Sequence, residues 1–478
     1  MLPINISRTF SKLDYAIIVV WIVIGGLSIF LESYVPVILL FSIFPIYLFF
    51  ANPFIFYCLL FFFIPISTEL ELGSLGTDFP TEPIMWLMLG FASLWALKNH
   101  SKLNTNYVRH PMTLLVLIHL TWILITCFFS TVPILSLKFL IAKIWYIVAF
   151  LLLPWLFIQN LKTLRTLILL CFSSLMFSLI IVLIRHGAQG FSFEAINFVL
   201  NPFFRNHVTF AAILVVFFPF LIYMFFHYKK YRILLGICLA CFVFGIYVSY
   251  TRAAYICLLS MPFTWIMYKW KLTKYVLILV IILSSYGIYT TYKNNSYLNL
   301  APDFNKTITH KDFDKLIEAT YNMEDISTME RLYRWVAGIQ MVQERPLLGF
   351  GPNGFYPNYK NFTVKSFRTY VSDNPERSGV HCYYFMVFIE QGIFGFIIFL
   401  ALVFYVLISG QRIYNETKES DTKMLIVCCI LSFVSILLML LINDLLESDK
   451  VGTWFLFIIA LLVKIDLSNH RLAKLLNS

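Results

Sequence analysis

The chain has 478 residues, of which 60% are hydrophobic, 18% are aromatic and only 13% are charged. Average soluble chains carry about 25% charged residues. This sequence therefore has too few charged residues to cover the surface of a soluble protein of the same length. The composition therefore excludes a soluble enzyme, a disordered protein and a nucleic-acid-binding protein, and it predicts a membrane protein.

Fourteen continuous apolar segments follow one another along the chain, and most are long enough to cross a bilayer as a helix, which takes about 20 residues. A membrane β-barrel would show shorter segments of alternating polarity. We therefore predict an all-α polytopic membrane protein with about 12–14 transmembrane helices. The segments cover residues 15–31, 33–50, 53–68, 83–97, 111–129, 136–158, 164–184, 207–227, 232–250, 253–268, 275–291, 382–409, 424–442 and 451–464.

The basic residues are divided unevenly between the predicted loops. If the N-terminus is inside, the inner loops hold nineteen of the 36 Lys and Arg residues, whereas the short outer loops hold only Arg185, Arg205, Arg252 and Lys450. Cytoplasmic loops are enriched in Lys and Arg, so we predict that both termini are cytoplasmic. The net charge of +11 is then mainly an orientation signal, and it needs no nucleic-acid partner.

Residues 292–380 form one long polar stretch, which the alternation of loops places outside the membrane. Within it, Thr328 is expected to cap a helix over residues 329–343, which ends before Pro346. The chain is thereby predicted to have three parts: transmembrane helices over residues 1–291, a partly helical periplasmic loop over residues 292–380, and transmembrane helices with a short cytoplasmic tail over residues 381–478.

Ionisable residues inside or beside an apolar segment are costly in lipid and usually mark a function. In this chain they are Lys138, Lys143, Arg205, His207, Arg252, His381, Glu390 and His119. Of these, Arg205, Arg252 and His381 predict a basic outer cavity suited to the diphosphate of a lipid-linked donor, because Arg binds phosphate through bidentate hydrogen bonds. The simpler alternatives are cationic side chains that reach the lipid interface, a structural partner in Glu390 and a packed helix residue in His119.

His381 separates the polar stretch from the apolar segment that comes after it. The near-neutral pKa of histidine suits a general base, and neighbouring cations would keep the imidazole neutral and able to accept a proton. The alternative is a polar residue at the membrane interface.

Residues 349–354 match the spacing G-x-G-x-x-G. A dinucleotide-binding loop requires a strand before it and a helix after it. Here a helix is predicted before the glycines, and Pro352 and Pro357 interrupt any helix after them. We interpret the glycines as turn positions that need a positive φ or a close approach of two backbones. The sequence shows no metal-ligand spacing, so we predict no metal site and no cofactor.

Four stretches in order carry a resemblance to a known family. They are Asn201–His207 followed by Phe210–Leu214; Tyr250–Ala254; Glu330–Trp335 followed by Met341–Gly354; and Val380–Tyr384 followed by Glu390–Gly395. Together they resemble the O-antigen ligase and O-antigen polymerase family of membrane glycosyltransferases, over residues 200–465. The chain departs from the family pattern at Cys382, where Asn or Ser is commoner, and at Thr251, where Ser is commoner.

The resemblance implies a reaction and a place in the cell. A glycan on undecaprenyl diphosphate would be transferred to an acceptor hydroxyl with inversion and without a metal, at the periplasmic face of the bacterial inner membrane. His381 would be the base, and Arg205, Arg252, Arg331 and Arg334 would hold the diphosphate. The further cavity residues would be Lys138, Lys143, His207 and Tyr383.

The acceptor separates the functions that remain open. Lipid A–core as the acceptor makes the protein a ligase, a second lipid-linked glycan makes it a polymerase, and a protein hydroxyl makes it a protein glycosyltransferase. A polysaccharide transporter or flippase is the alternative from another class, and it predicts broken helices at the bilayer midplane.

Overall fold

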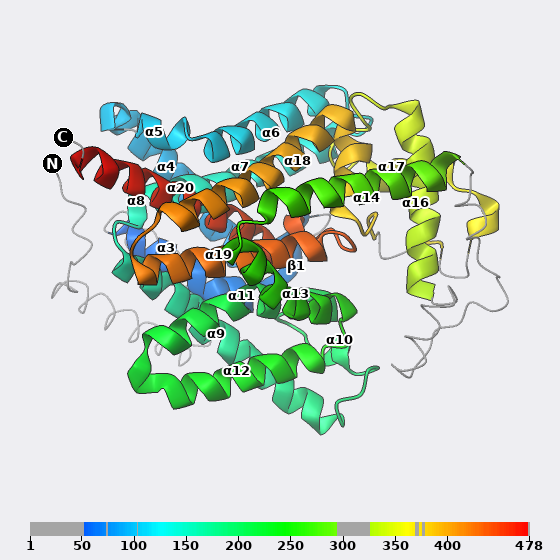
Figure 1. Ribbon diagram of the computed structural model, residues 1–478. Helices are drawn as coiled ribbons and strands as arrows, with labels where there is room; N and C mark the ends of the chain where they lie inside the picture. Colours follow the sequence, from blue (N-terminus) through cyan, green and yellow to red (C-terminus); the bar gives the residue numbers. More distant parts are fainter. Residues whose placement is uncertain are drawn as a thin grey trace, which may run out of the picture.

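Long apolar helices that run side by side make up most of the computed structural model (Figure 1). The structure describes residues 52–72, 75–102, 104–293, 326–368, 372–374 and 378–476. The α-helices are α3 Pro53–Phe63, α4 Thr81–Lys98, α5 Thr105–Val108, α6 Pro111–Phe128, α7 Pro133–Ile147, α8 Leu153–Phe157, α9 Leu161–Ala188, α10 Ile196–Val199, α11 His207–His227, α12 Arg232–Tyr247, α13 Arg252–Lys269, α14 Thr273–Lys293, α16 Ile326–Glu344, α17 Phe355–Asn358, α18 Tyr383–Glu416, α19 Ser420–Met439 and α20 Asp449–Leu476.

The predicted all-α membrane architecture is confirmed for the described residues. Eight helices there are long and apolar enough to cross a bilayer, and two shorter apolar helices cover Pro53–Ile66 and Thr273–Gly287. Each predicted apolar segment from residue 53 onward coincides with a helix. The predicted segments 15–31 and 33–50 lie outside the described residues, so the total of 12–14 stays a prediction.

The final apolar segment and the acidic stretch after α3 differ from the prediction. The short final segment is a 28-residue helix, α20. The acidic stretch after α3 forms an antiparallel hairpin of β1 (Thr68–Leu72) and β2 (Leu75–Phe79), in which Thr68 pairs with Phe79. The hairpin escapes a search for long apolar runs because its strands are short and polar.

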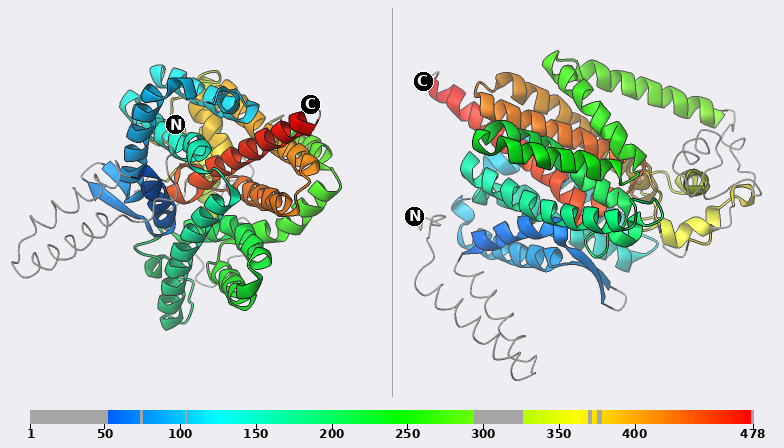
Figure 2. Two further views of the ribbon diagram at one scale, coloured as in Figure 1. Left: turned by 90° about the vertical axis from the view of Figure 1, so that its left-hand side faces the viewer. Right: turned by 90° about the horizontal axis from the view of Figure 1, so that it is seen from below.

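The centre of the bundle is formed by α11 and α20, which are buried along most of their apolar length. Helices that are hydrophobic all round are enclosed by other helices. Trp454 of α20 shows this packing, because its ring lies 5.3 Å from the ring of Phe217 and 5.1 Å from that of Phe220, both on α11. By contrast, α14 lies along the outside of the bundle in the right-hand view of Figure 2.

One end of the bundle carries His381 and is covered by α16 and α17; we call it the His381 end. In Figure 1 it lies on the right, and the far end of α20 lies on the left. Helix α16 begins at Ile326, so Thr328 lies inside the helix rather than capping it. Its buried apolar side chains pack with others of the outer stretch and with Ile389 of α18 into a second hydrophobic core: Tyr333, Val336, Ala337, Met341, Phe350, Phe355, Tyr359, Phe367, Val380 and Ile389.

Helix α18 is broken at Gly392, where a single continuous helix was predicted. Gly392 has φ 66° and ψ −173°, a region open essentially to glycine alone. The turn after α16 docks into the break, because the Ile393 N–H donates to Pro346 O (2.9 Å) and the Gly351 N–H donates to Glu390 O (2.8 Å). The break is therefore filled by protein.

The docked turn confirms the interpretation of the glycines. Gly349 and Gly351 have φ of 67° and 88°, and a Cβ on Gly349 would lie 2.5 Å from the Glu390 backbone. The Glu390 carboxylate accepts hydrogen bonds from the Asn353 N–H (3.0 Å) and the Phe355 N–H (3.2 Å), as expected of a structural partner. The two glycine-containing stretches thus form one interlocked unit.

Gly392→Ala is expected to lower the free energy of unfolding by about 2 kcal/mol or more, because alanine is strained at this φ and ψ and its Cβ would collide with Leu347 O. Gly90→Ala on α4 is the matched control, since nothing lies within 4 Å of an added Cβ there, and alanine favours a helix. Thermal unfolding in detergent compares the two variants. Equal stability would contradict the role of the break.

Candidate functional site

His381 lies between the outer stretch and α18, in a left-handed backbone conformation with φ 56°. Its N–H donates to Asp444 Oδ2 at 2.8 Å. A side chain held in this sparsely populated region costs of order 1 kcal/mol or more, and such strain gathers at functional sites. The hydrogen bond to Asp444 therefore supports the backbone of His381 in this conformation.

Two arginines one turn apart on α16 face His381. Burial, together with the charges of Arg334 and Arg331, lowers the pKa of the His381 imidazole to about 3. The direction is the one expected for a base that stays neutral. At neutral pH the imidazole is therefore uncharged.

Arg334 supports the segment that leads to His381. The Arg334 Nη1 donates to Gly379 O (3.4 Å), and its Nη2 pairs with Glu330 on the same helix (3.4 Å). The neighbouring Trp335 Nε1 donates to Val380 O (3.0 Å). Since the Arg334 side chain is also buried, these contacts suit a structural role.

Arg331 connects this group to the N-termini of two further helices. The charges of Arg331 and Arg252 both act on the imidazole of His207. His207 begins α11, Arg252 begins α13, and Thr251 Oγ1 donates to His207 O (3.2 Å). Helix N-termini carry a partial positive charge and expose N–H groups that favour anions.

The structure thus gathers part of the predicted set into one cationic group. His207, Arg252, Arg331, Arg334 and His381 lie together at the His381 end, although they come from four separate parts of the chain. The charges of Arg252 and Arg331 act on His207, and those of Arg331 and Arg334 act on His381, so Arg331 interacts with both imidazoles. The arrangement places three guanidinium groups and two imidazoles close together, and such cationic groups favour anions.

Other predicted residues lie elsewhere. The Arg205 side chain is 68% exposed, and its Nε lies 3.8 Å from Glu69 of the hairpin. Lys138 is exposed on α7. Lys143 is largely buried, and its ammonium pairs with Glu447 at 2.8 Å. Arg205 and Lys143 thus each have an acidic partner on another element.

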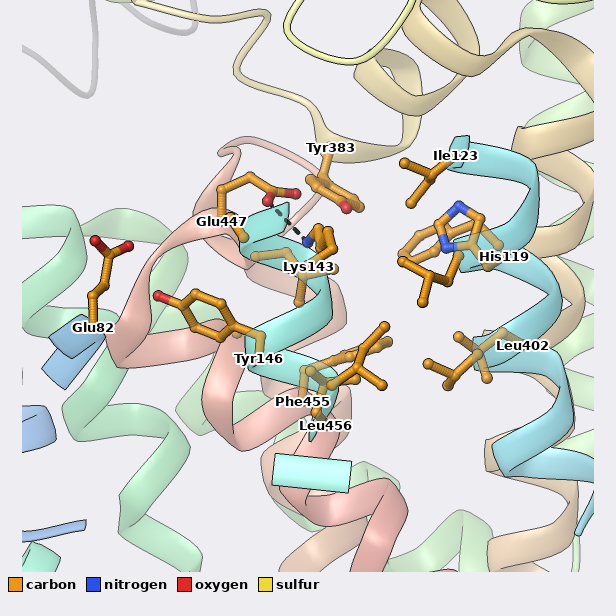
Figure 3. A pocket seen from close by; sticks show the side chains of 17 residues that line it. Glu82, His119, Ile123, Lys143, Tyr146, Tyr383, Leu402, Glu447, Phe455 and Leu456 are labelled. Carbon is orange, nitrogen blue, oxygen red and sulfur yellow. Dashed lines mark ion pairs between the residues drawn. The ribbon is translucent and has the colours of Figure 1, made fainter. Parts of the chain in front are cut away.

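A separate cavity of about 90 Å³ lies between α6, α7, α18 and α20 (Figure 3). It contains the Lys143–Glu447 ion pair together with the side chains of Tyr383 and His119. The imidazole of His119 lies 2.8 Å from Gln391 Oε1, beside the ring of Phe399. His119 is thus a packed helix residue with a hydrogen-bond partner, as the sequence favoured.

The sequence analysis missed Asp444 and Glu447 in the short segment between α19 and α20. Burial raises the pKa of Asp444 to about 6, although the hydrogen bond from the His381 N–H opposes the shift. Asp444 Oδ1 is buried and has no hydrogen-bond partner among the described residues. Acidic residues at the boundary of two apolar segments were the available signal, but only basic residues were used to assign topology.

The fold and the cationic group define a polytopic membrane protein with a cluster of Arg and His side chains at one end of its helix bundle. A protein-family model described as O-antigen ligase matches residues 237–400. The matched stretch supports membership of the O-antigen ligase family, whose members are glycosyltransferase-like enzymes. No curated protein matches the chain. The matched residues include Arg252, Arg331, Arg334 and His381, whereas Arg205 and His207 precede them.

Proposed function

We propose that the protein transfers a glycan from undecaprenyl diphosphate to a hydroxyl of lipid A–core, as an O-antigen ligase. One observation carries the proposal: a partly buried, uncharged His381 lies beside the arginines of α16, at the end of a membrane-spanning bundle. A base next to cations is the arrangement needed to deprotonate a hydroxyl while a phosphate leaves.

The reaction is a single displacement in this proposal. His381 takes the proton of the acceptor hydroxyl, and the acceptor oxygen bonds to the anomeric carbon of the glycan. The bond from that carbon to the diphosphate oxygen breaks, and its electron pair leaves with undecaprenyl diphosphate. Attack from the opposite face inverts the anomeric configuration.

Arg252 and Arg331 would stabilise the negative charge that develops on the diphosphate. The planar guanidinium of each forms two parallel hydrogen bonds with phosphate oxygens. Arg334 supports the His381 segment instead. Arg205 and His207 remain proposed donors at the rim. Arginines in these places would do the work that Mg²⁺ performs in many phosphate-transfer sites, so we propose a metal-independent reaction.

An assay with purified protein tests the proposal. Lipid-linked glycan is the donor, and lipid A–core, a second lipid-linked glycan or a protein is offered as the acceptor, with and without chelator. Transfer to lipid A–core in chelator is expected. Transfer only to the second lipid-linked glycan indicates a polymerase, transfer to protein indicates a protein glycosyltransferase, and loss in chelator contradicts metal independence.

Deleting the gene gives the corresponding result in cells. Core lacking attached polymer, while lipid-linked polymer accumulates, is expected for a ligase. Core carrying a single repeat unit indicates a polymerase instead. Lipopolysaccharide electrophoresis distinguishes the two patterns.

The break in α18 is the observation that favours a transporter, since broken helices bind substrate in many transporters. Here the break lies near the His381 end of the 34-residue helix, and the turn after α16 fills it through Pro346 and Leu347. Because that backbone is buried in protein rather than lining a cavity, its presence does not require transport. Movement of donor across vesicles without glycan transfer would favour the transporter.

The lowered pKa of His381 predicts the pH dependence of the reaction. An ordinary histidine is half protonated near pH 6.5, whereas a base with a pKa of about 3 stays neutral well below that pH. We expect kcat/KM to show no loss from protonation of His381 between pH 8 and about pH 5. Because the pKa of Asp444 is raised to about 6, any step near pH 6 should disappear in Asp444→Asn. A step near pH 6.5 that persists in Asp444→Asn would contradict the lowered His381 pKa.

A further inference from the structure

The ion pair between Lys143 and Glu447 crosses the cavity of Figure 3. Lys143 projects from the middle of α7, and Glu447 ends the short 3₁₀ helix Leu445–Glu447. The surrounding walls are mainly apolar side chains of α6, α18 and α20. A lysine inside an apolar helix is costly without a partner. The Lys143 side chain is 15% exposed and that of Glu447 is 31% exposed, so the lysine is the more buried member of the pair.

The segment that carries Glu447 accepts two hydrogen bonds from backbone N–H groups at the start of α18. Leu440 O accepts from the Tyr383 N–H (2.9 Å), and Asp444 Oδ2 accepts from the His381 N–H (2.8 Å). We call residues 440–448 the α19–α20 loop. The α19–α20 loop therefore binds the backbone N–H groups of both His381 and Tyr383, where the chain enters α18.

This loop has a further point of attachment in Lys143. Glu447 lies three residues from Asp444, so its position restricts where the Asp444 carboxylate can lie. His381 needs that restriction because its left-handed conformation is unfavourable without an outside partner. The chain of contacts runs from α7 through the loop to the imidazole-bearing residue.

We propose that Lys143 is a positioning residue for His381: by pairing with Glu447 it fixes the α19–α20 loop, and thereby Asp444 and the orientation of the base. This rests on the proposed function, in which His381 accepts the acceptor proton. It differs from the sequence prediction that Lys143 lines the substrate cavity, where its ammonium would contact the donor. The two roles predict opposite kinetic changes.

The test measures kcat and the donor KM of purified Lys143→Met, Lys143→Arg, Glu447→Gln and the charge-exchanged Lys143→Glu/Glu447→Lys protein. Lys143→Met and Glu447→Gln are expected to lower kcat about ten- to a hundredfold, since small misplacements of reacting groups cost this much, while donor KM changes less than about twofold. Lys143→Arg and the charge exchange should restore most of kcat. Lys162→Met, on an exposed residue at the opposite end of the bundle, is the matched control and should leave both constants unchanged.

Activity is expressed per folded protein, measured by size exclusion. If Lys143→Met folds poorly, the kcat values of Lys143→Arg and of the charge-exchanged protein test the proposal instead. A donor KM raised tenfold at constant kcat, without recovery on charge exchange, would overturn the proposal in favour of diphosphate binding. Full kcat in Lys143→Met would also overturn it. If His381→Ala abolishes transfer while Lys143→Met does not, the positioning role alone fails; if His381→Ala is fully active, the proposed base fails.

Discussion

Replacing His381 by alanine or asparagine is expected to lower glycan transfer by about 10²- to 10⁴-fold, the range that a general base contributes. Both variants remove the group that takes the acceptor proton. Asparagine tolerates the left-handed backbone found at His381, so it separates loss of the base from loss of the conformation. The measurement is the initial rate of transfer with purified protein at saturating donor and acceptor.

His100→Ala is the matched control, because His100 is an exposed histidine at the opposite end of the bundle, and its rate should equal that of the unaltered protein. Activity retained by His381→Asn but lost by His381→Ala would assign His381 a conformational role. Full activity in both variants would remove the proposed mechanism.

Replacing Arg331 or Arg252 by glutamine is expected to lower kcat by about 10²- to 10³-fold, as the loss of one donor to a developing oxyanion does. Lysine at either position should restore part of the rate, because it keeps the charge but cannot form the bidentate contact. The rate of undecaprenyl diphosphate release measures the effect directly.

Arg368→Lys provides the matched control, since the Arg368 side chain is 60% exposed and pairs with Asp373. It should leave transfer unchanged. If Arg252→Lys or Arg331→Lys were as active as the unaltered protein, bidentate phosphate binding by that residue would be wrong.

The interlocked turn and broken helix explain why two separate sequence motifs occur together. The Pro346–Gly354 turn needs the backbone of α18 as its partner, and α18 needs glycine at position 392 to admit the turn. The pair fixes the path of the chain on both sides of His381, since α16 precedes the turn and α18 comes after His381. Changes in either motif should therefore impair the same site.

Much of the architecture could be predicted from the sequence because the bilayer imposes a length and a polarity on each helix. Every apolar segment from residue 53 onward has its helix. The same physics identified His381 and Arg252, because ionisable residues beside lipid are costly and stand out against apolar neighbours. The break at Gly392 was hidden, since hydropathy averages across one glycine and carries no record of φ.

By itself, then, the sequence determined the membrane class, the helices of the described part and a short set of costly residues, because those depend on local composition. Only the tertiary structure decided which cations converge. It brings Arg252, Arg331 and His381 together, while Lys143 pairs with Glu447, 304 residues away in the chain. Such partners depend on how helices distant in sequence pack and on which acidic groups offset each charge, and neither is encoded in the periodicity of a single segment.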